Sequence, residues 1–412
     1  MINLKIAEKF NLEIILISLL PISLIIGNFA LNLNVILIII MFLVQNLNFS
    51  IFYKKYKYLV FLVSIFIILN SLFSSDYLNT LKGHAGILRY ILFFFAVVFF
   101  FKKNKKNFTY FTRVLVLSIL FVIFDSYIQF FFKQDIFGHV ISTNHGSRLS
   151  GPFGDEYIVG AFLLKTIFFT RKDELFKNNL IWYIYLILAF SIIVLAYQRM
   201  PTILFAASLL IFVFFDNKIN IKKSIIIVAT ISCALFFLFS KDSNLKKHYF
   251  DRTFEQIGIY KTTIEQTNVH KNFFDSQWGA HYLTAIEIFK DNKLLGSGIK
   301  TFRSVCDEKK YSKINSAEIA KRCSTHPHNI YLEILSESGF FGLIIFFILI
   351  IYFFQKSQLY QISEIKKKPE ILVLFFIFLW PVQTTGSIFS TWNGFFYPLF
   401  FAYAFQFVKN KK

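Results

Sequence analysis

Long runs of apolar residues without a single charge recur along this chain. Residues 34–52 and 180–198 are two of them. A helix of about 20 apolar residues crosses the roughly 30 Å hydrocarbon core of a bilayer, where each backbone amide must find its partner within the protein. The runs therefore predict about twelve membrane-spanning helices. We expect these spans at residues 11–30, 34–52, 58–74, 86–101, 110–132, 156–170, 180–198, 201–215, 224–240, 329–354, 371–387 and 393–408.

The composition excludes a soluble protein. Hydrophobic residues make up 56% of the chain and charged residues only 17%, whereas soluble domains carry about 25% charged residues. The net charge of +20 does not indicate a nucleic-acid partner, because the basic residues form no groove-sized patch and accompany no nucleic-acid motif. The basic residues instead mark the topology of the chain and its contact with membrane lipids.

Basic clusters alternate with the apolar runs and fall on one side of the membrane. Such clusters stay in the cytoplasm, so both termini are predicted to be cytoplasmic. Residues 241–327, between the ninth and tenth spans, then lie on the opposite side. The clusters are Lys5/Lys9, Lys54/Lys55/Lys57, Lys102/Lys103/Lys105/Lys106, Arg171/Lys172/Lys177, Lys218/Lys222/Lys223, Lys356/Lys366/Lys367/Lys368 and Lys409/Lys411/Lys412.

We expect an all-α fold, a polytopic membrane helical bundle with one long loop domain. The apolar runs lack the alternation of barrel strands, so a helical bundle is the spanning solution that fits. Its expected parts are residues 1–240 with nine transmembrane helices, the loop domain 241–327, and residues 328–412 with the last three helices.

The loop domain has two recognisable features. Tyr282, Ile286 and Phe289, with Ala285 and Ile288 beside them, follow helical spacing and predict an amphipathic helix on the membrane surface or against the bundle. Cys306 and Cys323 could pair in an oxidising compartment, which would contribute about 3 kcal/mol, or remain two free thiols. No His and Cys cluster has metal-ligand spacing, so we expect neither a metal nor a cofactor.

A histidine-rich stretch joins this loop to the tenth span. It reads His326-Pro327-His328-Asn329, and Gly339 and Gly342 follow within the span. A histidine at a helix N-terminus can exchange a proton with a hydroxyl or bind an anionic group, and Asn329 can orient its ring. This stretch is the predicted centre of the chemistry.

Five more charged residues are candidates for a membrane-embedded site. Arg89, Arg148 and Arg199 lie near the predicted outer ends of spans, where a guanidinium fork could hold phosphate oxygens or only reach toward lipid headgroups. Glu333 and Glu337 lie one turn apart in the tenth span and should face the bundle interior. They could bind sugar hydroxyls or form a structural ion pair.

The order of these features resembles the O-antigen ligase and O-antigen polymerase family of membrane glycosyltransferases. The resemblance implies a GT-C-like helical bundle in the bacterial inner membrane, an active site that faces the periplasm, and a metal-independent reaction. It covers roughly residues 80–345 and rests on Arg148 with Ser150-Gly151-Pro152-Phe153, on Arg199 at the start of the eighth span, on Leu295-Gly296-Ser297-Gly298 followed by Phe302-Arg303, and on His328-Asn329 with Gly339 and Gly342.

The resemblance also implies substrates and roles. The donor would be a glycan on undecaprenyl diphosphate, and the acceptor a lipid A-core sugar or another glycan. Arg199 would bind the diphosphate, and His328 would act on the acceptor hydroxyl or the donor. The expected substrate-binding residues are Arg148, Arg89, Asn329, His326, Arg303, Glu333, Glu337 and His281.

The chain departs from the family pattern at two places. Asp155-Glu156 stand where many relatives have Pro-Asn. The start of the amphipathic helix, residues 276–282, lacks the arginine that relatives tend to carry there, so Arg252, Arg303 or His281 would have to supply the second cation.

Four functions fit these residues. A ligase would move a finished glycan onto a lipid A-core sugar, and a polymerase would extend one lipid-linked glycan with another; a protein-glycosylating relative would use the same chemistry. A polysaccharide transporter or lipid flippase is the alternative of another class, and it would more often show repeated halves or broken midplane helices.

Overall fold

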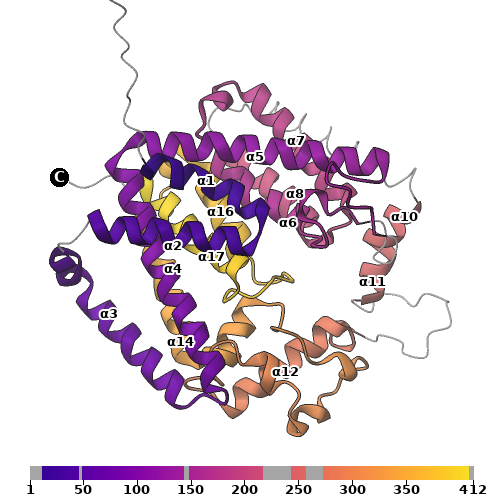
Figure 1. The fold of residues 1–412 in the computed structure, drawn as a ribbon. Helices are drawn as coiled ribbons and strands as arrows, with labels where there is room; N and C mark the ends of the chain where they lie inside the picture. Colours follow the sequence, from indigo (N-terminus) through magenta and orange to yellow (C-terminus); the bar gives the residue numbers. More distant parts are fainter. Residues whose placement is uncertain (1–11, 46–48, 143–147, 217–242, 257–271, 408–412) are drawn as a thin grey trace, which may run out of the picture. The chain divides into compact units, whose positions relative to one another are not determined.

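The computed structural model describes residues 12–45, 49–142, 148–216, 243–256 and 272–407, and their regular secondary structure is helical (Figure 1). Four of the described helices are long and apolar enough to cross a membrane: α2 (Asn28–Gln45), α4 (Tyr77–Lys103), α5 (Lys105–Phe132) and α14 (Ile330–Lys356). Large apolar side chains face outward, as at Phe29, which is 83% exposed. Such surfaces require an apolar surrounding, so the fold is that of a helical membrane protein.

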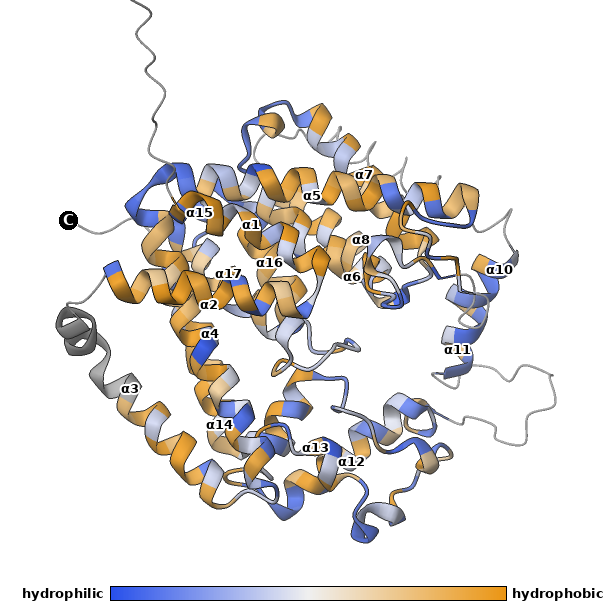
Figure 2. Cartoon of the chain, in the orientation of Figure 1, coloured by the Kyte–Doolittle hydropathy of each residue, from blue (hydrophilic) through white to orange (hydrophobic). Residues whose placement is uncertain are grey.

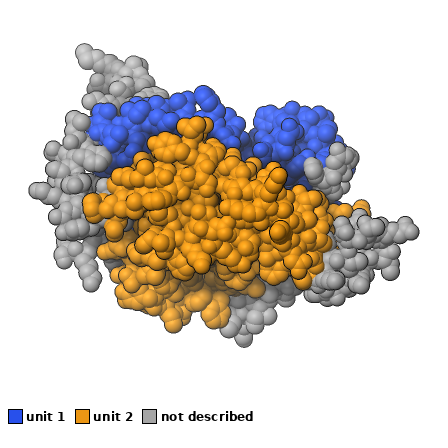
Figure 3. All heavy atoms as spheres, turned by 90° about the horizontal axis from the view of Figure 1, so that it is seen from below, with its two compact units in different colours: residues 1–47, 89–206, 395–412 blue, residues 48–88, 207–394 orange. Residues whose placement is uncertain are grey.

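The chain divides into two compact units (Figure 3). The first comprises residues 1–47, 89–206 and 395–412, and the second comprises residues 48–88 and 207–394. Three of the four unit boundaries fall inside helices, namely α4, α8 (Arg199–Phe215) and α17 (Thr391–Gln406), so both units draw on distant parts of the sequence. The expected division at residues 240 and 327 refers to membrane topology and stays a prediction.

The first unit is a bundle in which α1 packs against α2 and α5, and α6 packs against α7. Asn104 begins α5 by accepting a hydrogen bond from the amide of Lys106 at 2.9 Å, and α5 ends at Lys133, which has a left-handed φ of 65°. These are ordinary start and stop signals of a helix. The helices not yet bounded are α1 (Leu12–Ile26), α6 (Val159–Thr166) and α7 (Asn179–Leu195).

The second unit combines apolar helices with more polar, shorter ones (Figure 2). Its helix α12 packs against α14, and α14 also contacts α3. A small hydrophobic core forms where α12 and α13 meet, around Ala285, Ile288, Phe302 and Val305. The helices of this unit are α3 (Phe49–Leu72), α10 (Ser243–Lys246), α11 (Arg252–Gln256), α12 (Gln277–Asp291), α13 (Phe302–Val305), α14, α15 (Ile362–Lys367) and α16 (Pro369–Leu379).

A helix lies within each expected span except the ninth, 224–240, which is outside the described residues. Several ends differ from the prediction: α2 begins at Asn28 rather than residue 34, and α3 (Phe49–Leu72) begins nine residues before the expected 58. Two further differences have a clear local cause. The fourth helix begins at Tyr77 rather than residue 86, because the Asp76 carboxylate caps it by accepting from the amide of Asn79 at 3.1 Å. The eleventh ends at Leu379 rather than residue 387, since Pro381 has no amide to continue it.

The predicted amphipathic helix is present as α12. Ser276 is the N-cap of α12, and its Oγ accepts a hydrogen bond from the amide of Gly279 at 3.1 Å. Of the expected apolar positions, Ala285 and Ile288 are buried, and Tyr282, Ile286 and Phe289 are half-buried. His281 and Thr284 are buried beside them, so His281 faces inward.

A glycine break in α14 lets the polar loop after α12 dock onto it. Gly339 has φ 64° and ψ −163°, and the amides beyond it leave the helix ladder. The Phe340 amide donates to the Lys293 carbonyl at 2.8 Å, and the Phe341 amide donates to the Leu294 carbonyl at 3.2 Å. A Cβ at Gly339 would overlap the Leu294 carbonyl. The Leu295–Gly298 motif and the glycine motif of α14 are therefore two halves of one packing contact.

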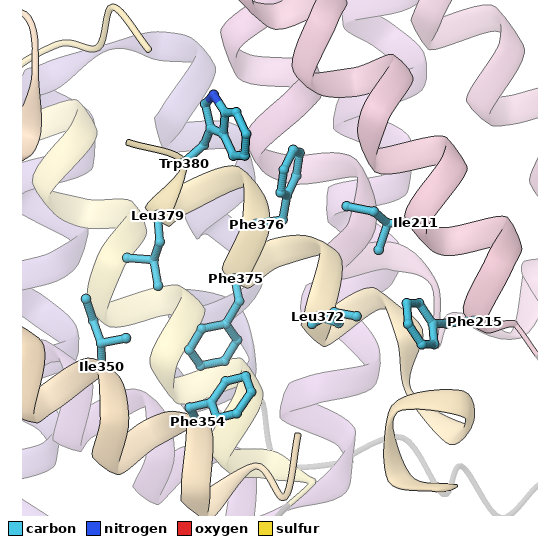
Figure 4. Close-up of a pocket in the computed structure, with 9 residues that line it drawn as sticks. All are labelled: Ile211, Phe215, Ile350, Phe354, Leu372, Phe375, Phe376, Leu379 and Trp380. Atoms are coloured by element: carbon cyan, nitrogen blue, oxygen red, sulfur yellow. The ribbon is translucent and has the colours of Figure 1, made fainter. Parts of the chain in front are cut away.

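An apolar pocket of about 420 Å³ lies between α8, α14 and α16 of the second unit (Figure 4). Its lining has no titratable side chain. The pocket is therefore a feature of the hydrophobic helices and carries no acid–base chemistry. The lining residues are Ile211, Phe215, Ile350, Phe354, Leu372, Phe375, Phe376, Leu379 and Trp380.

Candidate functional site

Three histidines of the second unit lie together at the N-terminal end of α14. The ring centroids of His326 and His328 are 4.1 Å apart, and those of His281 and His328 are 5.3 Å apart. The Trp278 indole packs edge-on against His328 at 4.9 Å between centroids. We call His281, His326 and His328 the histidine cluster. The first turns of α12 and the N-terminus of α14 therefore lie next to each other at these histidines.

The backbone at His328 is held in an uncommon conformation. Its φ is 58°, in the left-handed region that non-glycine residues rarely adopt. The Thr385 amide donates to the His328 carbonyl at 2.9 Å and stabilises this turn. Strained residues of this kind cluster at functional sites, where the surrounding contacts hold them.

Asn329 begins α14 and ties it to the segment after α16. Its Oδ1 accepts from the amides of Tyr331 at 3.0 Å and Leu332 at 3.2 Å, and its Nδ2 donates to the Pro381 carbonyl at 2.8 Å. Asn329 therefore fixes the turn that carries His328, while the hydrogen-bond partner of the His328 ring is Ser324, whose Oγ lies 3.1 Å from Nε2.

Carbonyl partners define the protonation of the two other rings. His326 Nε2 lies 3.0 Å from the Thr385 carbonyl, which only accepts, so Nε2 carries hydrogen. His326 Nδ1 then accepts from the Thr325 hydroxyl at 2.8 Å. His281 Nδ1 donates to the Arg322 carbonyl at 3.3 Å in the same way. In the neutral form, both rings have a defined tautomer.

All three histidines favour the neutral form. Burial, together with the neighbouring His326 and His281, lowers the pKa of His328 to about 3. Burial also lowers the pKa of His281 and of His326, and the Arg303 charge adds to the effect on His326. The cluster is therefore uncharged at neutral pH and can accept protons or hydrogen bonds.

The structure distinguishes the three candidates for the second phosphate-binding cation, which are Arg252, Arg303 and His281. A neutral His281 cannot neutralise a phosphate. Arg303, on α13, is exposed and lies close enough to His326 for its charge to lower that pKa. Arg252 begins α11, and no described contact joins it to the cluster. Arg303 is thus the cation best placed beside the histidines.

Glu333 and Glu337 are buried, and their carboxylates accept hydrogen bonds from other parts of the protein. Glu333 accepts from the Ser387 hydroxyl and from the Ile388 amide, the latter at 2.9 Å. Glu337 accepts from the amides of Lys300 at 2.6 Å and Phe302 at 3.0 Å. Both carboxylates hold loops against α14, and a sugar-binding role for them stays a prediction.

Cys306 and Cys323 form a disulfide with a Cα–Cα distance of 5.3 Å. It joins the end of α13 to the segment just before the histidine stretch. Cys306 is fully buried in the core between α12 and α13. The third cysteine, Cys233, lies outside the described residues.

The three arginines of the prediction belong to the first unit. Arg199 is the first residue of α8, where the helix N-terminus adds a partial positive charge. Arg148 precedes Ser150 and Gly151, whose amides donate to Gln129 Oε1 at 2.9 and 2.8 Å.

Arg89 does not lie near a helix end as expected. Because α4 begins nine residues before the predicted start of the span, Arg89 is in its interior. Its Nη1 donates to Asn32 at 2.7 Å and its Nη2 to the Tyr90 hydroxyl at 3.0 Å. A substrate-binding role for Arg89 stays a prediction.

The sequence reading missed several residues that contact the cluster. Trp278, Ser324 and Thr325 lie in the loop domain, and Thr385 lies after α16. The hydroxyl residues directly before His326 were a usable signal, because neutral imidazoles pair with hydroxyls. Thr385 gave none, since it is 57 positions beyond His328 and was assigned to a span.

The described residues contain no group of three or more His, Cys, Asp or Glu arranged to hold a metal ion. No curated protein matches the chain. Residues 184–347 match the family model described as O-Antigen ligase. The matched segment contains α8 with Arg199, the disulfide, the histidine cluster and both glycine motifs. Over these residues the chain is similar to the O-antigen ligase family of glycosyltransferase-like enzymes.

Proposed function

We propose that the protein transfers a glycan from undecaprenyl diphosphate to a lipid A-core sugar at the periplasmic face of the bacterial inner membrane. The observation that carries this proposal is the neutral histidine cluster at the head of α14, within the segment that matches the O-antigen ligase family. Chemistry on a lipid-linked glycan needs a proton acceptor and cations at a membrane surface.

The leaving group requires positive charge. When the bond from the anomeric carbon to the diphosphate breaks, the electron pair stays on the diphosphate. We assign Arg199 to this charge, because its fork can hold two phosphate oxygens and because it begins α8, where the helix N-terminus favours an anion. Arg303 is the second cation by its place beside His326. Arg148 is the further candidate, in the loop before Ser150.

The acceptor hydroxyl requires a base. Its oxygen bonds to the anomeric carbon, and its proton passes to the neutral ring of His328. Without substrate, the pKa of His328 is about 3, which makes the ring a weak base. A bound diphosphate anion raises the pKa of a nearby imidazole, so His328 becomes a better base when the donor is present. His326, fixed by Thr385, supports the ring beside it.

The membrane arrangement follows from charge and length. We propose about twelve spans with cytoplasmic termini and a periplasmic loop 241–327. The disulfide supports this placement, because the periplasm allows cysteines to pair. The reaction is proposed to need no metal, since arginines supply the charge that a metal would otherwise provide.

A polymerase that extends a lipid-linked glycan is the second candidate, because it uses the same donor and the same bond-forming step. The two differ in the acceptor alone. The lipopolysaccharide banding of a deletion strain separates them. Loss of capping with accumulated lipid-linked polymer indicates the ligase, and capping with a single repeat indicates the polymerase.

The test uses purified full-length protein with a lipid-diphosphate glycan and an acceptor. His328→Ala should slow transfer by about 10²-fold or more, because an acid–base group contributes roughly 10² to 10⁴. His326→Ala should cost less, and chelators should leave the wild-type rate unchanged. Ser312→Ala, on an exposed residue of the same loop, is the control for handling and folding.

Two outcomes would contradict the proposal. Transfer by His328→Ala at the rate of Ser312→Ala would remove the base from the mechanism. Equal losses from both histidine variants together with chelator sensitivity would indicate a metal site at His326-Pro327-His328.

A further inference from the structure

Each histidine of the cluster has a hydrogen-bond partner in one short stretch, residues 322–326. A backbone carbonyl and two hydroxyls of this stretch point to three different rings. The pairs are Arg322 O with His281 Nδ1 at 3.3 Å, Ser324 Oγ with His328 Nε2 at 3.1 Å, and Thr325 Oγ1 with His326 Nδ1 at 2.8 Å. The orientation of the whole cluster therefore depends on where residues 322–326 lie.

Residues 322–326 are not held by a helix or a strand. Within the described part of the chain, the amides of residues 323–326 donate to no backbone carbonyl. The stretch is held instead at Cys323 through the disulfide to Cys306, and at its end by the bond of His326 Nε2 to the Thr385 carbonyl. The neighbouring Arg322 guanidinium adds bonds to the Cys306 carbonyl at 3.2 Å and to Asp307 Oδ1 at 2.9 Å.

The other end of this connection is rigid. Cys306 directly follows α13 and is fully buried with Val305, Ala285 and Ile288. Since α12 also carries His281, the disulfide attaches residues 322–326 to the same packed core that positions one of the rings. The covalent bond thus links two sides of the histidine cluster.

We propose that the Cys306–Cys323 disulfide is a positioning element for glycosyl transfer, which keeps residues 322–325 against the three histidines and so keeps their rings oriented and buried. This inference rests on the proposed function of His328. Cys306 and Cys323 touch no substrate in this scheme. They act through Arg322, Ser324 and Thr325.

The expected consequence of losing the disulfide is a change in pH dependence. The titratable groups that face His328 are His281 from α12 and His326 from its own stretch, and Arg303 of α13 acts on His326. If residues 322–325 move away, water reaches the rings and the pKa of His328 returns toward its ordinary value near 6.5. The base is then protonated, and inactive, over a pH range in which the wild type remains neutral.

The experiment compares the double variant Cys306→Ser/Cys323→Ser with the wild type, measuring kcat and KM from pH 5.5 to 8.5. With a base of pKa near 6.5, kcat/KM, which reports the free enzyme, should fall about tenfold at pH 5.5 relative to pH 8.5, whereas the wild-type ratio stays near one for this group. Val305→Ala is the matched control, because it opens the same core and keeps the disulfide. It should lower the amount of active protein equally at every pH.

A second measurement, on the wild type, replaces the first if the double variant does not fold. Folded wild type is treated with a reductant, and maleimide labelling should count one thiol before and three after, since the chain has three cysteines. The reduced enzyme should show the shifted profile, and reoxidation should restore the original one. A wild-type pH profile in the reduced enzyme, or a loss equal to that of Val305→Ala at every pH, overturns the proposal. Full activity in His328→Ala would instead remove the proposed function itself.

Discussion

Replacing Gly339 by alanine should detach the loop that carries the Leu295–Gly298 motif. At φ 64° and ψ −163°, Gly339 occupies a region that is essentially reserved for glycine, where another residue costs about 1–3 kcal/mol. The new Cβ would also lie 2.6 Å from the Gly296 amide nitrogen, too close to keep the contact.

The loss of the docked backbone adds to this cost. The amides of Phe340 and Phe341 bind the carbonyls of Lys293 and Leu294 at 2.8 and 3.2 Å, and each bond contributes about 0.5–1.5 kcal/mol. Together with the backbone strain, the docked state loses about 2–6 kcal/mol. Because about 1.4 kcal/mol is tenfold, the open state becomes about 30-fold to 10⁴-fold more populated.

Hydrogen exchange of the detergent-solubilised protein measures this population. The amides of Ser297 and Gly298, which donate to Ser336 and Glu337 carbonyls at 2.9 and 3.0 Å, should exchange faster by the same factor. Gly86→Ala is the control, since that helical glycine has open space around its Cβ, and alanine favours a helix. Unchanged exchange in Gly339→Ala, or equal acceleration in Gly86→Ala, would refute the reasoning.

Three further predictions concern charge, topology and pH. Arg199→Lys should lose most transfer activity at normal abundance, because an ammonium cannot form the two-pronged contact with a diphosphate; near-normal activity would leave Arg199 as a headgroup contact. A cysteine at Lys313 should react with an impermeant reagent from the periplasmic side and one at Lys106 should not, and the reverse pattern would invert the topology. The folded-state pKa values of His281 and His328 lie below the ordinary 6.5, so their contribution to stability is present above pH 6.5 and is lost as pH falls. The thermal midpoint should therefore drop between pH 7 and pH 5, by less in His281→Gln, and an equal drop in that variant would contradict the link.

The local elements of the fold could be predicted from the sequence because they depend on neighbours in the chain. Apolar runs of membrane length became helices, and Arg199 begins α8 as expected. The helical spacing after Ser276 became α12, with Ala285 and Ile288 buried as expected and with His281 and Thr284 buried beside them. Periodicity reveals that a helix forms, but the side that becomes buried depends on the partner, here α14.

The connections between distant residues were decided by the tertiary structure alone. Glu333 binds Ser387 and Ile388, more than 50 positions away, so no local pattern could reveal that this carboxylate holds a loop. The predicted eleventh span ended early at Pro381 and left Thr385 free to bind His326 and His328. The sequence by itself determined which residues could do chemistry at a membrane face. Burial and packing depend on the whole second unit. They decided that the three histidines are neutral, that Arg303 is the neighbouring cation, and that one disulfide-held stretch orients all three rings.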